Sequence, residues 1–164
     1  MLKILNVGNG NNKYPGNFTK KEKKIIKYNC KGRVLNLFAG LSSIGTDKVD
    51  FNNGNIKMDV FEFLKKNKIY YNTILLDAPF NDKFANIYKK LGNTPDQFII
   101  FAMNRKTTEL FNYIKKMNPE RIIIKSWNYY IPEGYKLNKG YLCYAGGYRK
   151  PTILLIIDLS LIHI

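Results

Sequence analysis

Residues 33–40 read Arg33-Val-Leu-Asn-Leu-Phe-Ala-Gly40, a nearly continuous apolar run that ends at a glycine. Such a run, bounded by a turn residue, is typical of a buried strand. The small-residue turn Leu41-Ser-Ser-Ile-Gly45 follows it and leads to a second short strand at 48–51. Similar runs predict strands at 56–58, 71–76 and 121–124. The three isoleucines of the last run suit a strand that is covered on both faces.

Helical spacing is found between these strands. Thr19 fits an N-cap position and Glu22 completes a capping box, which predicts a short basic helix over about 20–28. The spacing of apolar residues predicts three further helices, at 60–66, 82–91 and 95–117. Residues 1–18 combine a short apolar start with glycines, asparagines and a proline, so we expect a loop there.

The chain should close with an antiparallel strand pair, 141–145 and 152–159. Strands that alternate with helices and then form a closing hairpin predict an α/β fold, with a mostly parallel sheet and an antiparallel C-terminal strand. A chain of 164 residues suits one domain, 1–164, with an N-terminal loop and basic helix (1–32) and a core (33–164).

The composition favours a polyanionic partner. Lysine and arginine total 27 against 12 acidic residues, a formal charge of +15, and only four of the basic residues are arginines. Lysine neutralises phosphates more than it reads base edges, so the excess suggests general attraction to nucleic acid. The alternative is that the lysines merely solvate the surface.

Other features exclude whole classes of protein. Cys30 and Cys143 are far apart without a CxxC pair, so we expect no metal and a reduced, cytoplasmic protein. The only histidine, His163, lies at the chain end and is a poor candidate for a catalytic base. The apolar tail 153–164 is shorter than the roughly 20 residues that span a bilayer, so we expect no membrane association.

Ligands of open α/β sheets bind beyond the carboxyl ends of the strands. Each predicted strand end contains a polar or charged residue, and the first also ends in a glycine: Asn36-Leu-Phe-Ala-Gly40, Asp50, Asp59, Asp77-Ala-Pro-Phe80 and Lys125-Ser-Trp127. Three carboxylates and a glycine turn should therefore gather on one edge.

Several of these strand-end segments resemble the motifs of a known enzyme family. VLNLFAGLSSIG (34–45) resembles the S-adenosylmethionine (SAM) motif of class I methyltransferases, particularly the FxGxG form of DNA amino-methyltransferases. DAPF (77–80) is similar to their catalytic [Asp/Asn/Ser]-Pro-Pro-[Tyr/Phe/Trp] motif, and residues 140–159 are similar to the last strand pair of small archaeal and viral members. The resemblance implies a Rossmann-like class I methyltransferase sheet and SAM as the cofactor. The residues implied to bind SAM are Asn36, Phe38, Ala39, Gly40, Asp50, Asp59 and Val60, and the implied catalytic residues are Asp77, Ala78, Pro79 and Phe80.

The residue types suit the cofactor roles that the resemblance implies. Gly40 lets the backbone approach the methionine part of SAM, with Phe38 and Ala39 shaping that wall. Asp50 can accept hydrogen bonds from ribose hydroxyls. Asp59 can accept from the adenine amino group, with Val60 or Phe61 against the ring. The alternatives are that Asp50 caps a turn and Asp59 caps the helix at 60–66.

The catalytic roles centre on Asp77. An exocyclic amine is a poor nucleophile because its lone pair is conjugated into the ring. The Asp77 carboxylate and the Ala78 carbonyl can accept both N–H bonds and free that lone pair. Pro79 stiffens the loop, and Phe80 can stack on an extruded base. The alternative is that Asp77 bonds its own turn.

Three positions depart from the family pattern. Asn36 replaces an acid, Ser42 replaces the second glycine and Ala78 replaces the first proline. The expected activity is methylation of a base amino group, adenine N6 in DNA ahead of cytosine N4, with RNA as an alternative substrate. The departures favour a further alternative, a non-catalytic SAM-fold subunit that binds nucleic acid.

Basic and aromatic side chains concentrate in two segments, as suits phosphates and unpaired bases. The expected nucleic-acid-binding residues are Lys20, Lys21, Lys23, Lys24, Lys27, Trp127, Tyr129, Lys136, Arg149 and Lys150. A chain of this length has no room for a separate target-recognition domain, so sequence specificity should be low or come from a protein partner. A homodimer remains an open alternative.

Overall fold

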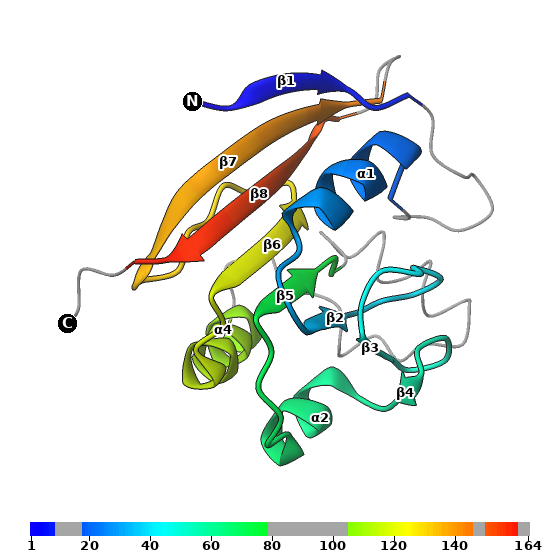
Figure 1. The fold of residues 1–164 in the computed structure, drawn as a ribbon, viewed down its shortest axis with the longest axis vertical. Helices are drawn as coiled ribbons and strands as arrows, with labels where there is room; N and C mark the ends of the chain where they lie inside the picture. The colour runs from blue at the N-terminus through cyan, green and yellow to red at the C-terminus, as the bar shows by residue number, and fades with distance from the viewer. Residues whose placement is uncertain (9–17, 79–104, 146–149, 161–164) are drawn as a thin grey trace.

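The computed structural model describes residues 1–8, 18–78, 105–145 and 150–160. Their strands form one eight-stranded sheet in the order β1-β7-β8-β6-β5-β2-β3-β4 (Figure 1). The strands are β1 (Lys3–Asn6), β2 (Val34–Leu37), β3 (Asp47–Asp50), β4 (Ile56–Lys57), β5 (Thr73–Leu76), β6 (Arg121–Ser126), β7 (Tyr135–Tyr144) and β8 (Thr152–Leu159). The helices are α1 (Lys20–Asn29), α2 (Val60–Lys66) and α4 (Arg105–Met117).

The sheet is parallel from β4 through to β6, and β8 runs antiparallel to both β6 and β7. This confirms the α/β class and the mostly parallel sheet with an antiparallel C-terminal strand. The predicted helix at 82–91 and the first part of the one at 95–117 lie outside the described residues.

Two expectations for the far edge of the sheet were wrong. Residues 3–6, expected in a loop, form β1, which pairs in parallel with β7. Its Ile4 is 82% exposed, so pairing rather than burial makes it a strand. The strand expected at 141–145 starts at Tyr135, because β7 continues through a polar stretch with a register irregularity between Leu137 and Lys139.

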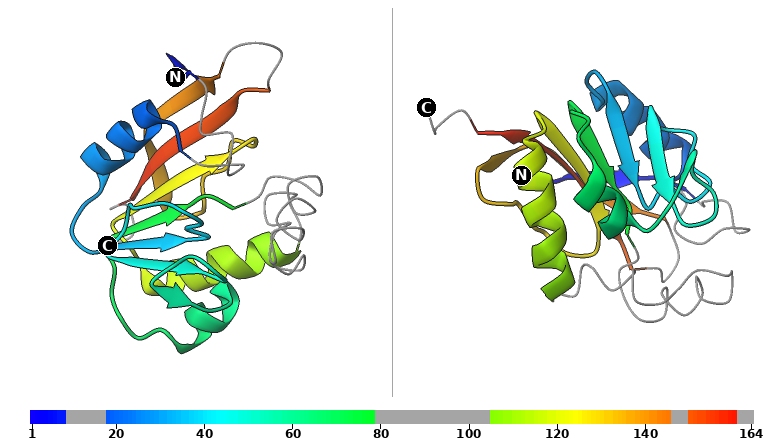
Figure 2. Two further views of the ribbon diagram at one scale, coloured as in Figure 1. Left: turned by 90° about the vertical axis from the view of Figure 1, so that its right-hand side faces the viewer. Right: turned by 90° about the horizontal axis from the view of Figure 1, so that it is seen from below.

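The two faces of the sheet are covered by different helices (Figure 2). Side chains alternate between the faces of a strand, so Ile74 and Leu76 join the core beneath α2 and α4, whereas Leu75 joins the core beneath α1. Ile26 is the fully buried apolar residue that α1 contributes to its core. Both faces of the central strands are therefore buried, as their continuous apolar runs predicted.

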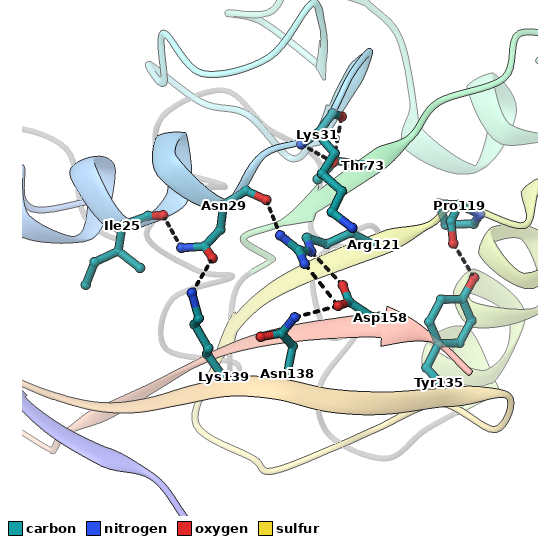
Figure 3. A network of polar contacts seen from close by, with 10 residues as sticks. All are labelled: Ile25, Asn29, Lys31, Thr73, Pro119, Arg121, Tyr135, Asn138, Lys139 and Asp158. Carbon is teal, nitrogen blue, oxygen red and sulfur yellow. Dashed lines mark hydrogen bonds and ion pairs between the residues drawn. The ribbon is translucent and has the colours of Figure 1, made fainter. Parts of the chain in front are cut away.

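Helix α1 begins with the predicted capping box. The Thr19 hydroxyl accepts from the Glu22 N–H at 3.3 Å, and the Thr19 N–H donates to the Glu22 carboxylate at 2.7 Å. Figure 3 shows how the other end of the helix is held, where the Asn29 carbonyl accepts from Arg121 Nη1 at 2.8 Å. Lys139 Nζ donates to the Asn29 side chain at 3.3 Å. Both ends of α1 are thus fixed, and the second is fixed to the sheet.

We expect Thr19→Ala to lower the free energy of unfolding by about 1 kcal/mol, because the Glu22 N–H loses its capping acceptor. Thr19→Ser is the control, since serine supplies the same hydroxyl. Urea unfolding of the three proteins measures the difference. Equal stability of the alanine and serine variants would contradict the role of the cap.

No helix within the described residues is long and apolar enough to span a membrane.

Candidate functional site

The strand order reverses between β2 and β5. From β2 the chain builds outward through β3 to β4, and then returns to pair β5 with the opposite side of β2. Such a switch point is where open α/β sheets bind ligands, beyond the carboxyl ends of the strands. Leu37 and Leu76 are paired at the ends of β2 and β5, so Gly40 and Asp77 follow neighbouring strands at the same edge. The two central predicted segments are therefore brought together.

The glycine turn after β2 is sharply bent. Phe38 has a φ of 60° and Gly40 a φ of 51°. The left-handed region costs a residue with a side chain about 1–2 kcal/mol, but glycine can adopt it freely. Phe38 is 8% exposed and its ring belongs to the core beneath α2 and α4. Phe38 therefore shapes this edge through its backbone, and Ala39, 6% exposed, is also buried.

The Asp50 carboxylate lies at the end of β3 and ties two turns together. One oxygen accepts from the Gly40 N–H at 3.0 Å, and the other accepts from the N–H groups of Asn52 and Asn53 at 3.0 and 2.9 Å. These contacts match the turn-capping alternative for Asp50. A carboxylate has about four acceptor positions, so three backbone bonds leave room for one more donor.

Asp59 is the N-cap of α2, and its carboxylate accepts from the Glu62 N–H at 2.9 Å. This contact matches the helix-capping alternative and occupies one of its oxygens. Val60 is 3% exposed and packs in the core, whereas Phe61 is only partly buried. Of the two residues considered for the adenine ring, Phe61 is the more accessible.

Asn36 is fully buried in the middle of β2. Its Nδ2 donates to the Ile44 carbonyl at 2.8 Å, while Oδ1 has no hydrogen-bond partner in the described part of the chain. A carboxylate here would face a carbonyl oxygen with no proton to donate. The Asn36 amide thus ties β2 to the connection between β2 and β3, which has nine residues and contains no helix.

Asp77 follows β5 directly and is partly buried. Burial raises the pKa of its carboxyl to about 7; the Lys125 ammonium opposes the rise and the Glu22 carboxylate adds to it. A group whose pKa lies near the working pH can both accept and return a proton, as an acid–base residue must. Ala78 is 1% exposed, and Pro79 and Phe80 lie outside the described residues.

The sequence analysis missed the buried ion pair beside Asp77. Lys125 is 5% exposed and Glu22 1% exposed, and their charged atoms are 3.3 Å apart. The sequence predicted Lys125 only as a strand-end residue and Glu22 only as a capping residue. The available signal was a lysine in a strand that is otherwise apolar from Ile122 to Ile124.

The expected nucleic-acid-binding residues fall into separate places. The lysines of α1 are exposed except for Lys23, which is partly buried. Trp127 follows β6 at the same edge as Asp77, with Lys150 Nζ 4.6 Å from the centre of its ring, and Tyr129 is 54% exposed. Lys136 lies near the start of β7, at the opposite end of the sheet, and Arg149 is outside the described residues.

The carboxyl edge of β2, β5 and β6 thus carries a bent glycine turn, a carboxyl whose pKa burial raises to about 7, and an aromatic–lysine pair. Within the described residues, no three histidine, cysteine or acidic side chains are grouped as metal ligands would be. Comparisons of the chain with protein-family models, with curated proteins and with solved structures found no match.

Proposed function

We propose that this protein is a SAM-dependent methyltransferase that acts on an exocyclic amino group of a nucleic-acid base, with adenine N6 in DNA as the preferred acceptor. The observation that carries the proposal is the placement of Gly40 and Asp77 on neighbouring strands at the switch point. The parallel sheet with antiparallel β8 is what a resemblance to class I methyltransferases implies. The charge of +15 suits a polyanionic substrate.

The residues at this edge fit SAM. Gly40 has no side chain to collide with a ligand beside its backbone, and the Asp50 and Asp59 carboxylates keep acceptor positions for hydroxyl and amino donors. When bound, SAM supplies an electrophilic methyl group on a positively charged sulfur. The chain must then hold the acceptor amine in line with that methyl group and exclude water.

Asp77 and Ala78 bind and orient the amino group that accepts the methyl group. The Asp77 carboxylate and the Ala78 carbonyl each accept one N–H of the base, which localises the nitrogen lone pair for attack. Bound SAM would supply the methyl group to this nitrogen, and the part of Asp77 and Ala78 would be to hold the nitrogen in place. The nitrogen then gives up one proton to the carboxylate, which passes it to water. The pKa of about 7 for Asp77 suits this exchange at neutral pH.

The direct test is transfer of a tritiated methyl group from SAM to a panel of single- and double-stranded DNA and RNA, followed by identification of the labelled nucleoside. We expect the labelled nucleoside from DNA to be N6-methyldeoxyadenosine. Competition between DNA and RNA decides the substrate class. A folded protein that labels none of the substrates would overturn the proposal.

We expect Asp50→Asn to weaken SAM binding about tenfold, because one charge-assisted hydrogen bond is worth about 1.5 kcal/mol. The matched control is Asp47→Asn, which changes the same residue type at the opposite end of β3, where the carboxylate pairs with Arg33. Calorimetric titration with SAM measures both. Equal affinities of the two variants would remove Asp50 from the cofactor site.

A second candidate is a nucleic-acid-binding subunit with this fold but without catalysis. It is favoured by the engagement of Asn36, Asp50 and Asp59 with the protein's own backbone. Calorimetry distinguishes the two. Absence of SAM binding up to millimolar ligand, together with salt-dependent binding to nucleic acid, supports the subunit.

A further inference from the structure

The buried ion pair between Glu22 and Lys125 links α1 to the carboxyl edge of the sheet. Lys125 Nζ lies 3.3 Å from Glu22 Oε2 and 5.2 Å from the centre of the Phe18 ring. The same glutamate caps α1 through Thr19. The ion pair and the helix start are therefore built from one carboxylate.

The register of β5 and β6 places this pair next to Asp77. Leu76 pairs with Ile124, so Asp77 and Lys125 are the next residues along the two neighbouring strands. Lys125 is two residues beyond Ile123, whose side chain joins the core beneath α1. Lys125 therefore shares the α1 face of the sheet with Ile123.

The Glu22–Lys125 ion pair is almost fully shielded from solvent. Taking two charges out of water costs more than their attraction commonly returns, so a buried pair is weak evidence of stabilisation. Glu22 and Lys125 are each more than nine-tenths buried, while the capping role alone requires only an acceptor at position 22. The lysine, in particular, has no part in the cap.

We propose that the Glu22–Lys125 ion pair positions and balances the charge around Asp77, so that the docking of α1 sets the protonation of the carboxyl that receives the substrate amine. This inference rests on the proposed function only for the role of Asp77. Lys125 acts through Asp77 and is a positioning residue.

Among the described residues, the charges that act on Asp77 come from two elements, Lys125 from β6 and Glu22 from α1. Cys143 of β7 faces the same pair, but burial raises the pKa of its thiol to about 12, so it stays neutral. The two charges act on Asp77 in opposite directions. The ammonium favours the carboxylate, and the Glu22 carboxylate favours the protonated form.

Opposite charge removals should consequently shift Asp77 in opposite directions. Glu22→Gln keeps the capping box, because glutamine serves at that position, but leaves the ammonium unopposed. We expect it to lower the titration midpoint of Asp77 by about 1 pH unit, and Lys125→Met to raise it by about as much. The double variant should return towards the original midpoint.

The test is a carbon-13 NMR titration of the aspartate carboxyls, without SAM or nucleic acid, with Asp77→Asn to identify the resonance. Lys24→Met is the control, because this exposed lysine of α1 should leave the midpoint unchanged. If Lys125→Met does not fold, Glu22→Gln and the double variant still decide the sign. A midpoint that is the same in all variants, or that moves the same way in both single variants, overturns the inference.

The NMR titration and the methyl-transfer assay test the charge balance at Asp77 and the proposed function separately. If the midpoint shifts as expected but no substrate is labelled, the proposed function fails and the charge balance at Asp77 stands. If methyl transfer occurs, the acid limb of its pH profile should move with the NMR midpoint in each variant. If methyl transfer occurs but the acid limb of the pH profile does not move, the proposed function stands and the positioning role of Lys125 is refuted.

Discussion

We expect Asp77→Ala to reduce the proposed methyl transfer by about 10³-fold, the middle of the range for loss of a positioned acid–base group. The alanine keeps the backbone carbonyls of the loop but removes the carboxylate that accepts one N–H of the base. SAM binding should be nearly unchanged, because the residues proposed to bind the cofactor follow β2, end β3 and cap α2. Single-turnover transfer and calorimetry measure the two effects separately.

Asp77→Asn is the informative companion to the alanine variant. Asparagine is one of the residues that the family motif admits, and its amide oxygen can still accept an N–H. A carboxyl with a pKa of about 7 should make activity fall below pH 7. Asparagine cannot titrate, so this fall should be absent from the pH profile of Asp77→Asn. Full activity of the alanine variant would refute the catalytic assignment of Asp77.

Local sequence patterns were sufficient to predict the centre of the sheet. The apolar runs ending at Leu37 and Leu76 identify buried strands, and parallel neighbours bring their carboxyl ends to one edge. Thr19 and Glu22 predicted the start of α1 because a capping box needs only residues three apart. Each of these features depends on interactions close along the chain, or on a rule common to parallel sheets.

What the sequence could not predict depends on distant partners. Glu22 and Lys125 are 103 residues apart, so the apolar neighbours of Lys125 indicate that it is buried but do not identify its partner. β1 becomes a strand because it pairs with β7, although its side chains are mostly exposed. For Asp50 the sequence left ribose binding and turn capping open, and it did not identify the Gly40 N–H among the three backbone donors that the fold directs to this carboxylate.

Arg121→Met should lower the free energy of unfolding by about 3 kcal/mol, because removing one partner leaves a buried charge unpaired. The Arg121 guanidinium donates to both Asp158 oxygens, at 2.6 and 3.0 Å, and to the Asn29 carbonyl at 2.8 Å (Figure 3). It thereby joins β6, β8 and the end of α1. We take the lower end of the usual range because the Asp158 side chain is 20% exposed.

Arg33→Met is the matched control for this prediction. Arg33 also forms an ion pair with an aspartate, Asp47, at 2.8 Å, but its side chain is 44% exposed. Exposed pairs contribute about 0–1 kcal/mol, so the control should be close to the original protein. Urea unfolding at neutral pH compares them. Equal losses of unfolding free energy in the two variants would mean that burial of the Arg121–Asp158 ion pair does not increase its contribution to stability.

The pH dependence of stability supplies a second, independent check. Burial alone would raise the pKa of Asp158, but hydrogen bonds from Arg121 and Asn138 lower it overall. Because the folded pKa is lower than the unfolded value of about 3.9, the contribution of the pair is present above that value. It is lost as the pH falls through the folded pKa. In Arg121→Met the burial penalty is opposed only by the Asn138 hydrogen bond and the Lys31 charge, so protonation of Asp158 should restore part of the lost stability as the pH falls. Arg121→Met combined with Asp158→Leu removes the orphaned charge and should be more stable than Arg121→Met alone, since an apolar pair can replace a buried ion pair at little cost.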